Sequence, residues 1–134
     1  MDRKGFTLIE LLIVIIILGI LASLAIPRLA GRTEEARIQA ARSDIEGGLS
    51  TALDLYEMDM GKYPARLEDL IRKPAGGSRW KGPYFKKRNI PLDPWKHPYV
   101  YRFPGTNNNS EYDLSSNGPD GIEGNQDDIT NWNA

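Results

Sequence analysis

The chain has 134 residues, enough for one domain, and little apolar surface remains for its core once a membrane-spanning segment is set aside. It has no cysteine, which excludes a disulfide framework and makes another stabilising element, such as a metal, worth seeking. The formal net charge of −1 gives no indication of nucleic-acid binding.

The first feature along the chain is an apolar stretch of 21 residues from Phe6 to Ile26, whose only charge is that of Glu10. At about 1.5 Å per residue, a helix of this length crosses the apolar core of a bilayer. A signal peptide or a plain anchor would explain the stretch but not the acid within it. A carboxylate in the membrane interior costs roughly 2.5–3.5 kcal/mol, so Glu10 needs either a partner or a hydrated position near the interface.

The residues around this stretch are more specific. A short charged leader ends in glycine and is followed by phenylalanine and, at the fifth position of the new chain, glutamate: MDRKG-FTLIE. This pattern resembles the class III leader of type IV pilins and pseudopilins. The resemblance implies that a prepilin peptidase cuts after Gly5 and that the new amine of Phe6 is methylated. Residues 1–5 are then the leader and residues 6–27 a membrane and polymerisation helix, in which Glu10 pairs with the Phe6 ammonium of a neighbouring copy.

The charges that flank the stretch disagree with the motif about topology. The leader carries Arg3 and Lys4, but Arg28, Arg32, Arg37 and Arg42 follow the stretch, so a count of basic residues places the C-terminus inside. The leader motif implies the opposite, a single-pass protein of the bacterial inner membrane with its C-terminal domain in the periplasm. We adopt the orientation that the motif implies.

The segment after Pro27 predicts a second, amphipathic half of the helix, over residues 28–60. Proline and the glycines at 19 and 31 indicate a kink or a locally melted segment near residues 19–31. Gly47 and Gly48 each cost about 1 kcal/mol within a helix, which close packing by a neighbour would explain. Met60-Gly61 marks the end of the helix. Apolar residues recur at three- and four-residue steps, a pattern that favours a stripe facing the domain core: Ile38, Ala41, Ile45, Leu49, Ala52, Leu53, Tyr56 and Met60.

The remaining residues predict a small α+β domain. Residues 61–98 are rich in turn-forming residues and form a loop region with one short helix, LEDLIRK, over residues 67–73. The alternating YVYRF, residues 99–103, predicts a strand, with a second strand over about Ser110 to Leu114. The expected fold is one long helix packed on a small antiparallel sheet, with the sheet and a metal-binding loop in residues 99–134.

Motifs within the domain narrow the resemblance. G-x-YP from Gly61, WKGPY-x-KK from Trp80 and P-x-DPW-x-x-PY-x-Y from Pro91 together resemble the major pseudopilin, or G subunit, of type II secretion systems. Type IV pilins typically carry a C-terminal disulfide loop, which a chain without cysteine cannot form. One departure is Lys96-His97, where the family usually has glycine and often asparagine. Lys96 is strained if this turn needs a positive φ, and His97 is expected to be an exposed turn residue.

The acidic segment SSNGPDGIEGNQDDITNW, residues 115–132, is a candidate calcium loop. Its composition alone favours a disordered tail, but Ile129 and Trp132 could dock it on the domain. Aspartate oxygens suit calcium, although the spacing does not match an EF-hand. The resemblance implies a calcium cofactor and these ligands: the side chains of Asp120, Asp127 and Asp128, and the carbonyls of Leu114 and Asn117. Bound metal would neutralise the carboxylates and order the loop.

Three functions compete. The resemblance implies a structural subunit that polymerises into the pseudopilus, with minor pseudopilins, an inner-membrane assembly platform and its ATPase as partners, and that drives export of folded proteins across the outer membrane. A type IV pilin or competence pseudopilin, for adhesion or DNA uptake, shares the leader but not the domain motifs. An anchored enzyme is disfavoured, because the chain has one histidine, no cysteine and no G-x-S-x-G motif.

Charge along the domain is uneven and suggests how copies could meet. From Lys62 to Arg102 there are eleven basic and three acidic residues, whereas from Pro104 to the end there are six acidic residues and no basic one. A contact between the basic face of one copy and the acidic face of the next would be heterologous and would propagate as an open helix.

Overall fold

The computed structural model describes residues 4–132, and for residues 27–30 it describes the backbone alone. The chain divides into two compact units, Met1–Ala36 and Arg37–Ala134. The first three leader residues and the side chains at and just after Pro27 lie outside the described part.

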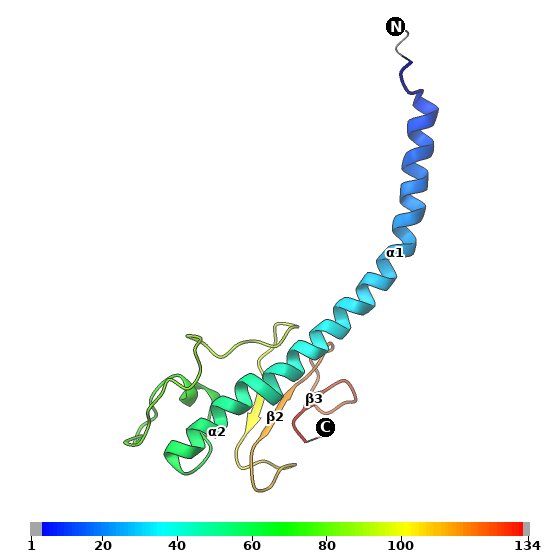
Figure 1. Cartoon of the computed structure of the whole chain (residues 1–134). Helices are drawn as coiled ribbons and strands as arrows, with labels where there is room; N and C mark the ends of the chain where they lie inside the picture. The colour runs from blue at the N-terminus through cyan, green and yellow to red at the C-terminus, as the bar shows by residue number, and fades with distance from the viewer. Residues whose placement is uncertain (1–3, 133–134) are drawn as a thin grey trace. The chain divides into compact units, whose positions relative to one another are not determined.

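Three successive helices run without a break from Leu8 to Met60 (Figure 1). They are α1, Leu8–Ser43, the π-helix η1, Asp44–Gly48, and α2, Leu49–Met60. Of the predicted kink or melted segment near residues 19–31, melting does not occur: the backbone stays helical through Pro27. A proline removes only one hydrogen bond from the ladder, and the leucines, isoleucines and alanines around it support a helix. The predicted end is confirmed: Gly61 adopts a φ of 81°, and its N–H donates to the Glu57 carbonyl at 2.7 Å.

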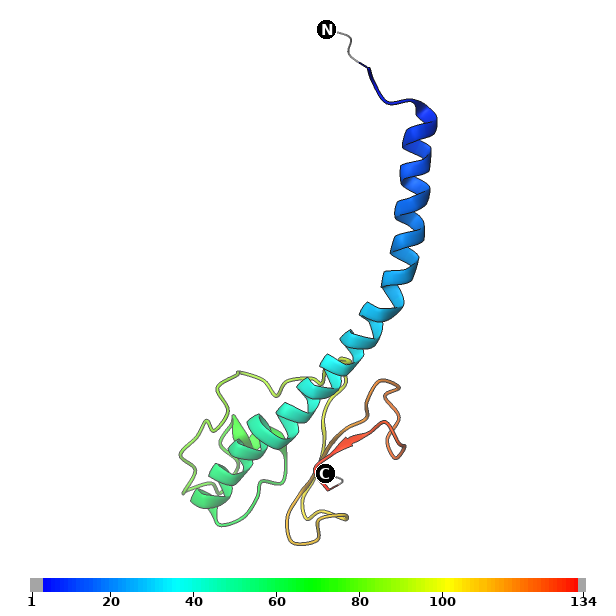
Figure 2. The ribbon, with the colours of Figure 1, turned by 45° about the vertical axis from the view of Figure 1, so that its right-hand side comes forward.

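The core of the second unit lies between the helices and the sheet, which remain side by side when the view is turned (Figure 2). The predicted apolar stripe is confirmed, with Ile38 and Met60 partly buried and the rest buried: Ala41, Ile45, Leu49, Ala52, Leu53 and Tyr56. From the other side the core receives Tyr99, Tyr112, Leu114 and Ile129. Burial of a large side chain contributes about 1.5–3 kcal/mol, so this seam holds the helix on the sheet.

The sheet has three antiparallel strands in the order β1-β2-β3. They are β1, Val100–Arg102, β2, Asp113–Ser116, and β3, Ile129–Thr130. Tyr101 pairs with Leu114, and Ser116 pairs with Ile129. The first strand was predicted one residue too long at each end. The second begins three residues later than predicted, because residues 105–111 form a loop that the Asp113 carboxylate caps.

The predicted short helix over residues 67–73 is reduced to one turn of 3₁₀-helix, η2, Leu67–Leu70. Pro74 disfavours helical backbone at the residue before it, which limits how far this turn can extend. Leu67 and Leu70 are buried in the core, so the segment still packs against α2.

Three tyrosines tie the helices to the rest of the second unit. The hydroxyl of Tyr99 donates to the Asp44 carboxylate at 2.7 Å. Two further bonds run from Tyr84 to Asp59 at 2.8 Å and from Tyr63 to Asp54 at 3.2 Å. Burial, followed by the hydrogen bond to Asp44, raises the pKa of Tyr99, so its hydroxyl keeps the proton that it donates.

Candidate functional site

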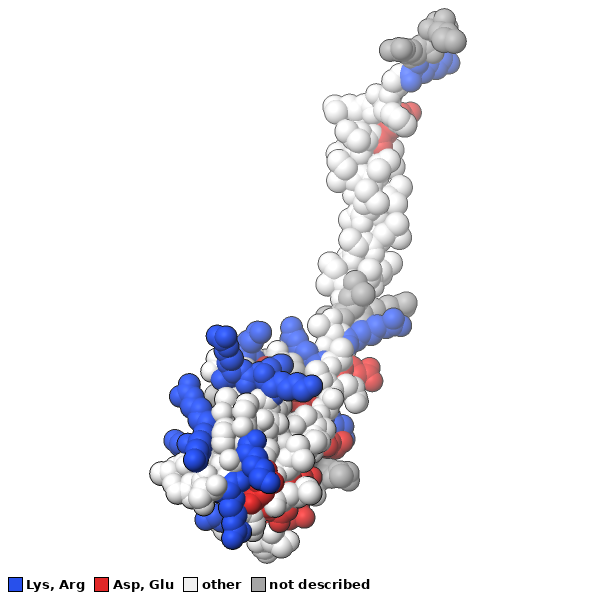
Figure 3. All heavy atoms as spheres, turned by 60° about the vertical axis from the view of Figure 1, so that its left-hand side comes forward, with Lys and Arg blue, Asp and Glu red and all other residues white. Residues whose placement is uncertain are grey.

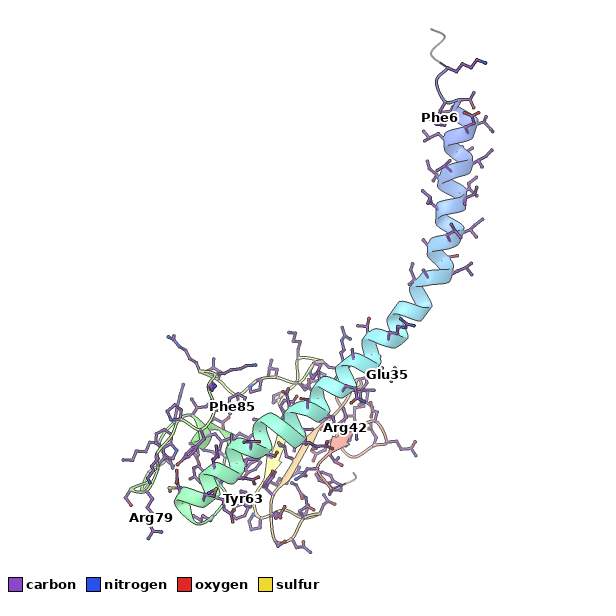
Figure 4. The ribbon with its side chains drawn as sticks, viewed as in Figure 1. Phe6, Glu35, Arg42, Tyr63, Arg79 and Phe85 are labelled. Atoms are coloured by element: carbon purple, nitrogen blue, oxygen red, sulfur yellow. The ribbon has the colours of Figure 1, made fainter. Side chains whose placement is uncertain are left out.

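The apolar stretch is exposed along its whole length. Phe6 is 93 % exposed, and every large apolar side chain from Leu8 to Ile26 is more than two-fifths exposed. In Figure 4 the side chains of this segment radiate from the helix, with Phe6 at its beginning. This helix is long and apolar enough to cross a membrane by length and composition. Side chains exposed in this way require lipid or another apolar surface around them.

Gly5 and Phe6 precede the first helical turn. Residues 4–7 are not helical, α1 begins at Leu8, and Gly5 is exposed. A cut after Gly5 would therefore leave the helix intact. The structure contains the chain with its leader, so the predicted amine at Phe6 and its pairing with Glu10 of a neighbour remain predictions.

Glu10 also makes a local contact that sequence reasoning missed. Its carboxylate accepts from the N–H of Thr7 at 3.0 Å, and the N–H of Glu10 donates to the Thr7 hydroxyl at 3.2 Å. This reciprocal pair is a capping box, which satisfies two otherwise unpaired backbone groups at the start of a helix. The pattern T-x-x-E directly before an apolar run was the available signal. Within one chain the carboxylate therefore already has a hydrogen-bond donor and lies at the positive end of the helix dipole.

The acidic loop between β2 and β3 is folded back on the domain. Gly118 is buried with a φ of 69°, and a side chain there would collide with the carbonyl oxygen of Asp127. This close approach brings the two ends of the loop together, as only glycine allows. Ile129 is buried in the core and Trp132 is partly buried, so both predicted docking residues contact the domain.

Four of the predicted metal ligands, Asn117, Asp120, Asp127 and Asp128, lie in this loop, whereas Leu114 lies in β2. The three carboxylates are not gathered into one cluster. Asp120 accepts from the N–H of Ile122 at 2.9 Å, and Asp128 accepts from the N–H of Gly124 at 2.7 Å. Asp127 accepts a long bond, 3.4 Å, from the N–H of Asp120. Among the described residues, no group of three or more histidine, cysteine, aspartate or glutamate side chains is arranged to hold a metal.

Two oxygens in the same loop nevertheless lack partners. Asn117 Oδ1 and Asp128 Oδ1 are buried and accept no hydrogen bond within residues 4–132. Asp128 also lines a cleft of 530 Å³ together with the oxygen-bearing side chains of Glu123, Asn125 and Gln126. A buried oxygen without a donor is costly, and a hard cation would satisfy it. The donor set therefore fits calcium better than a soft metal. The Leu114 carbonyl already accepts from the N–H of Asn131 at 3.1 Å and retains one lone pair.

His97 is not the exposed residue that the sequence predicted. It is half-buried, and its ring faces Gly121, where an added Cβ would lie 2.8 Å from Cε1. Lys96 has a φ of 70°, so the turn does need a positive φ and the lysine is strained there. The prediction for His97 was wrong because the folded acidic loop, which composition alone does not reveal, covers the turn.

On the face of the folded unit shown in Figure 3, basic side chains gather in large numbers. Between Lys62 and Arg102, two basic residues form ion pairs within the described part of the chain, Arg66 with Asp69 at 3.5 Å and Arg102 with Glu123 at 2.6 Å. The other exposed basic residues of the loop region form no ion pair within the described part of the chain: Lys62, Arg72, Lys73, Arg79, Lys81, Lys86, Lys87, Arg88 and Lys96. Two of them, Arg72 and Arg88, line a 230 Å³ cleft with Glu68 and Ile90.

Comparisons with known proteins agree with these features. Residues 28–132 match the family model described as type II secretion system (T2SS), protein G, and residues 1–26 match a prokaryotic N-terminal methylation motif. The chain is 43 % identical to type II secretion system core protein G of Pseudomonas aeruginosa over 98 % of this chain and 96 % of that protein. It is 44 % identical to the core protein G of Escherichia coli K12, over 97 % and 91 %.

A solved structure shares the fold. It is the crystal structure of the major pseudopilin from the type 2 secretion system of enterohaemorrhagic Escherichia coli, with a TM-score of 0.64 and 34 % identity. The match covers 81 % of this chain and 96 % of that one. The protein G model matches the domain, and the methylation motif matches the leader and the apolar helix. The match over the domain favours the secretion family over the pilins, which share only the leader. This chain belongs to the protein G family of type II secretion systems.

Proposed function

We propose that this chain is the structural subunit that polymerises into the pseudopilus of a type II secretion system. The observation that carries the proposal is the exposed apolar helix, Leu8 to Ile26, joined to a domain that matches the protein G model. The apolar side chains can be buried either in lipid or against the same helix of other copies. Both are favourable, because burial of apolar surface contributes about 25 cal/mol per Å². The role is structural rather than enzymatic, as in the major pseudopilin whose fold it shares.

Processing prepares the helix for assembly. A prepilin peptidase on the cytoplasmic side would cut between Gly5 and Phe6, where the chain is exposed and not yet helical. The new Phe6 amine, once methylated, remains a cation at the end of the apolar helix. Glu10 then has two roles: it caps its own helix through Thr7, and its charge pairs with the Phe6 cation of a neighbour.

The chain is anchored once in the inner membrane, and its domain, residues 28–134, lies in the periplasm. This orientation rests on the leader match. The other partners follow from the function: minor pseudopilins, the inner-membrane assembly platform and its ATPase, with membrane lipid around the helix before assembly. Growth of the polymer would then help to move folded proteins across the outer membrane.

The acidic loop binds calcium in this proposal. The unpartnered side-chain oxygens of Asn117 and Asp128 support it, and Asp120 and Asp127 are the further carboxylates within the same loop. The carbonyls of Leu114 and Asn117 complete the proposed set. When bound, calcium would supply positive charge that neutralises the carboxylates of the loop and fixes the loop, as a disulfide would in a chain with cysteines.

Contacts between neighbouring domains would use the charge separation. The cleft between Arg72 and Arg88 offers two guanidinium groups, neither paired within the described residues, to an acidic side chain of the next copy. The acidic loop and the exposed acids around it supply that charge. Because the two faces differ, the contact repeats from copy to copy without closing.

The test separates the two roles of Glu10. Glu10→Gln keeps an oxygen that can accept from Thr7 but removes the charge, whereas Glu10→Ala removes both. We expect both variants to insert in the membrane and to be processed, which intact mass of the extracted protein reports as loss of residues 1–5 and gain of a methyl group. Both should reduce sheared or pelleted polymer by roughly tenfold or more, because a preference of a few kcal/mol is lost. Normal polymer levels with Glu10→Gln would refute the charge pairing and leave capping as the role of Glu10.

A further inference from the structure

A buried carboxylate in the second unit has no role in the function proposed so far. Asp93 is only 2 % exposed, and it forms no ion pair with any described residue. Buried carboxylates without a cation are uncommon, because the charge loses its hydration unless several hydrogen-bond donors replace it. The donors that surround Asp93 indicate what the residue does.

One oxygen of Asp93 holds the turn that follows it. Oδ1 accepts from the N–H of Trp95 at 3.1 Å and from the N–H of His97 at 2.8 Å. The backbone of Asp93 closes the same turn, since its N–H donates to the His97 carbonyl at 2.8 Å and its carbonyl accepts from Lys96 at 2.9 Å. These four bonds fix the turn even though Lys96 occupies its strained position.

The other oxygen reaches the acidic loop. Oδ2 accepts from the hydroxyl of Ser116 at 2.7 Å, and that hydroxyl in turn accepts from the N–H of Gly118 at 3.2 Å. Ser116 is the last residue of β2 and is fully buried, and Gly118 is the position where the two ends of the loop meet. Asp93 thus determines the direction of the Ser116 hydroxyl and, through it, the position at which the loop begins.

The turn supports the loop at a second point. The backbone N–H of His97 donates to Asp93, and the ring of His97 packs against Gly121, between Asp120 and Ile122. The loop therefore rests on the turn at Gly118 and at Gly121, and both supports depend on one carboxylate. Asn117, with its unpartnered oxygen, lies between Ser116 and Gly118.

We infer that Asp93 is a positioning residue for the acidic loop: through Ser116 and His97 it holds the loop in the shape that calcium binding requires. The inference rests on the calcium binding proposed above, but it also makes a statement about the loop without metal. Partners that orient ligands from behind typically change metal affinity by about 10–100-fold, although they do not touch the metal.

The experiment compares Asp93→Asn with Asp113→Asn in the full chain in detergent. Both residues are buried carboxylates that accept backbone N–H groups, but Asp113 caps residues 106–108 rather than the acidic loop. Hydrogen exchange read by mass spectrometry follows segments 105–111 and 117–132 with a chelator and with calcium. Isothermal titration measures calcium affinity in the same samples. Ser116→Ala serves as a second, smaller change on the same path.

We expect Asp93→Asn to raise exchange in residues 117–122 without calcium and to weaken calcium binding by about tenfold or more, because its amide donates where the carboxylate accepts. Ser116→Ala should act in the same direction. Asp113→Asn should raise exchange in residues 105–111 and leave calcium affinity within about threefold of wild type.

Each outcome decides a separate point. Wild-type affinity and exchange in Asp93→Asn and Ser116→Ala would overturn the inference and leave calcium binding intact. Equal loss of affinity in Asp113→Asn would also overturn it, since any weakening of the domain would then suffice. Failure of the wild-type chain to bind calcium would overturn the calcium proposal. Hydrogen exchange of the chelated samples would then decide alone whether Asp93 positions the loop.

Discussion

At the scale of single residues, Lys96 occupies a conformation that costs free energy. It is the one non-glycine residue with a positive φ in the part of the chain that the structure describes. For residues with a Cβ this region costs about 1–2 kcal/mol, whereas glycine adopts it freely but loses more entropy on folding. Lys96→Gly should therefore raise the free energy of unfolding by about 0.5–1 kcal/mol, measured by urea denaturation. Lys96→Ala, which removes the charge but keeps the Cβ, should change it little; an equal gain in both variants would assign the effect to charge.

Asp113 makes the stability of the domain depend on pH in a narrow acidic range. Burial raises the pKa of its carboxyl, but the N–H groups of Asn107 and Asn108 and both donors of Thr106 more than offset this and lower the pKa to about 2. Because the folded pKa lies below the ordinary value of 3.8, the stabilisation is complete above about pH 4 and is lost as the pH falls toward 2.

The expected contribution is about 2 kcal/mol, read as the fall in unfolding free energy between pH 4 and pH 2. Other carboxyls titrate in the same range, so the comparison is with Asp113→Asn. This variant should be less stable at pH 5 and should show a shallower decline. A decline as steep as that of wild type would show that other carboxyls account for the acid sensitivity.

Sequence reasoning at this scale was right about residue types and incomplete about contacts. It singled out Glu10 for its charge in an apolar run but overlooked the T-x-x-E pattern that indicates the bond to Thr7. It found the acidic loop, but not the support from Asp93, which is 23 residues from Ser116 in the chain. Such contacts depend on how the turn and the strand meet, and no local pattern encodes that meeting.

At the scale of elements, the π-helix at Asp44–Gly48 ends in a glycine pair that helix propensity does not explain. π-helical turns are rare and occur mostly as single turns within α-helices. Nothing lies within 4 Å of a Cβ placed on Gly47, and Gly48 would meet only the Phe85 ring at 3.8 Å, an ordinary contact. The glycines are therefore not required by packing within one chain.

Gly47→Ala should raise the free energy of unfolding by about 0.5–1 kcal/mol, because alanine loses less backbone entropy in a helix. Chemical denaturation of the unassembled chain in detergent measures this. Gly48→Ala, which adds a contact to Phe85, is the matched comparison. A loss of stability in both variants would mean that the π-turn itself needs glycine.

The elements that could be predicted are those long enough to show a repeating pattern of apolar residues. The stripe from Ile38 to Met60 gave the second half of the helix and its buried face, and glycine gave its end. The third strand escaped prediction because Ile129–Thr130 is too short to show alternation. It exists because the acidic loop returns to pair with Ser116, which is a tertiary effect.

At the scale of the whole molecule, the family was predicted correctly from motifs in the leader and the domain, and the match to the protein G model confirms it. What motifs cannot supply is how copies meet. The basic side chains gathered on the face in Figure 3 support an electrostatic part of that contact, in addition to the apolar helix.

Polymer formation should therefore weaken with salt. The Debye screening length falls from about 10 Å at 0.1 M salt to about 3 Å at 1 M, which reduces the attraction between exposed charges. We expect the pelleted fraction of detergent-extracted chain to fall across this range, and the paired substitution of Arg72→Gln and Arg88→Gln to reduce both assembly and its salt dependence. Lys62→Gln, outside the 230 Å³ cleft, is the control. Assembly that is unaffected by salt would leave the apolar helix as the sole attraction.

The exposed helix from Leu8 to Ile26 has one further consequence. A subunit that leaves the polymer is not stable in water, because its apolar side chains would again be exposed to solvent. Growth and shrinkage must therefore be an exchange between two apolar surroundings, the fibre and the bilayer, with no aqueous pool between them. The supply that limits elongation is then the density of subunits in the plane of the membrane, and a retracting fibre returns its subunits to that same store.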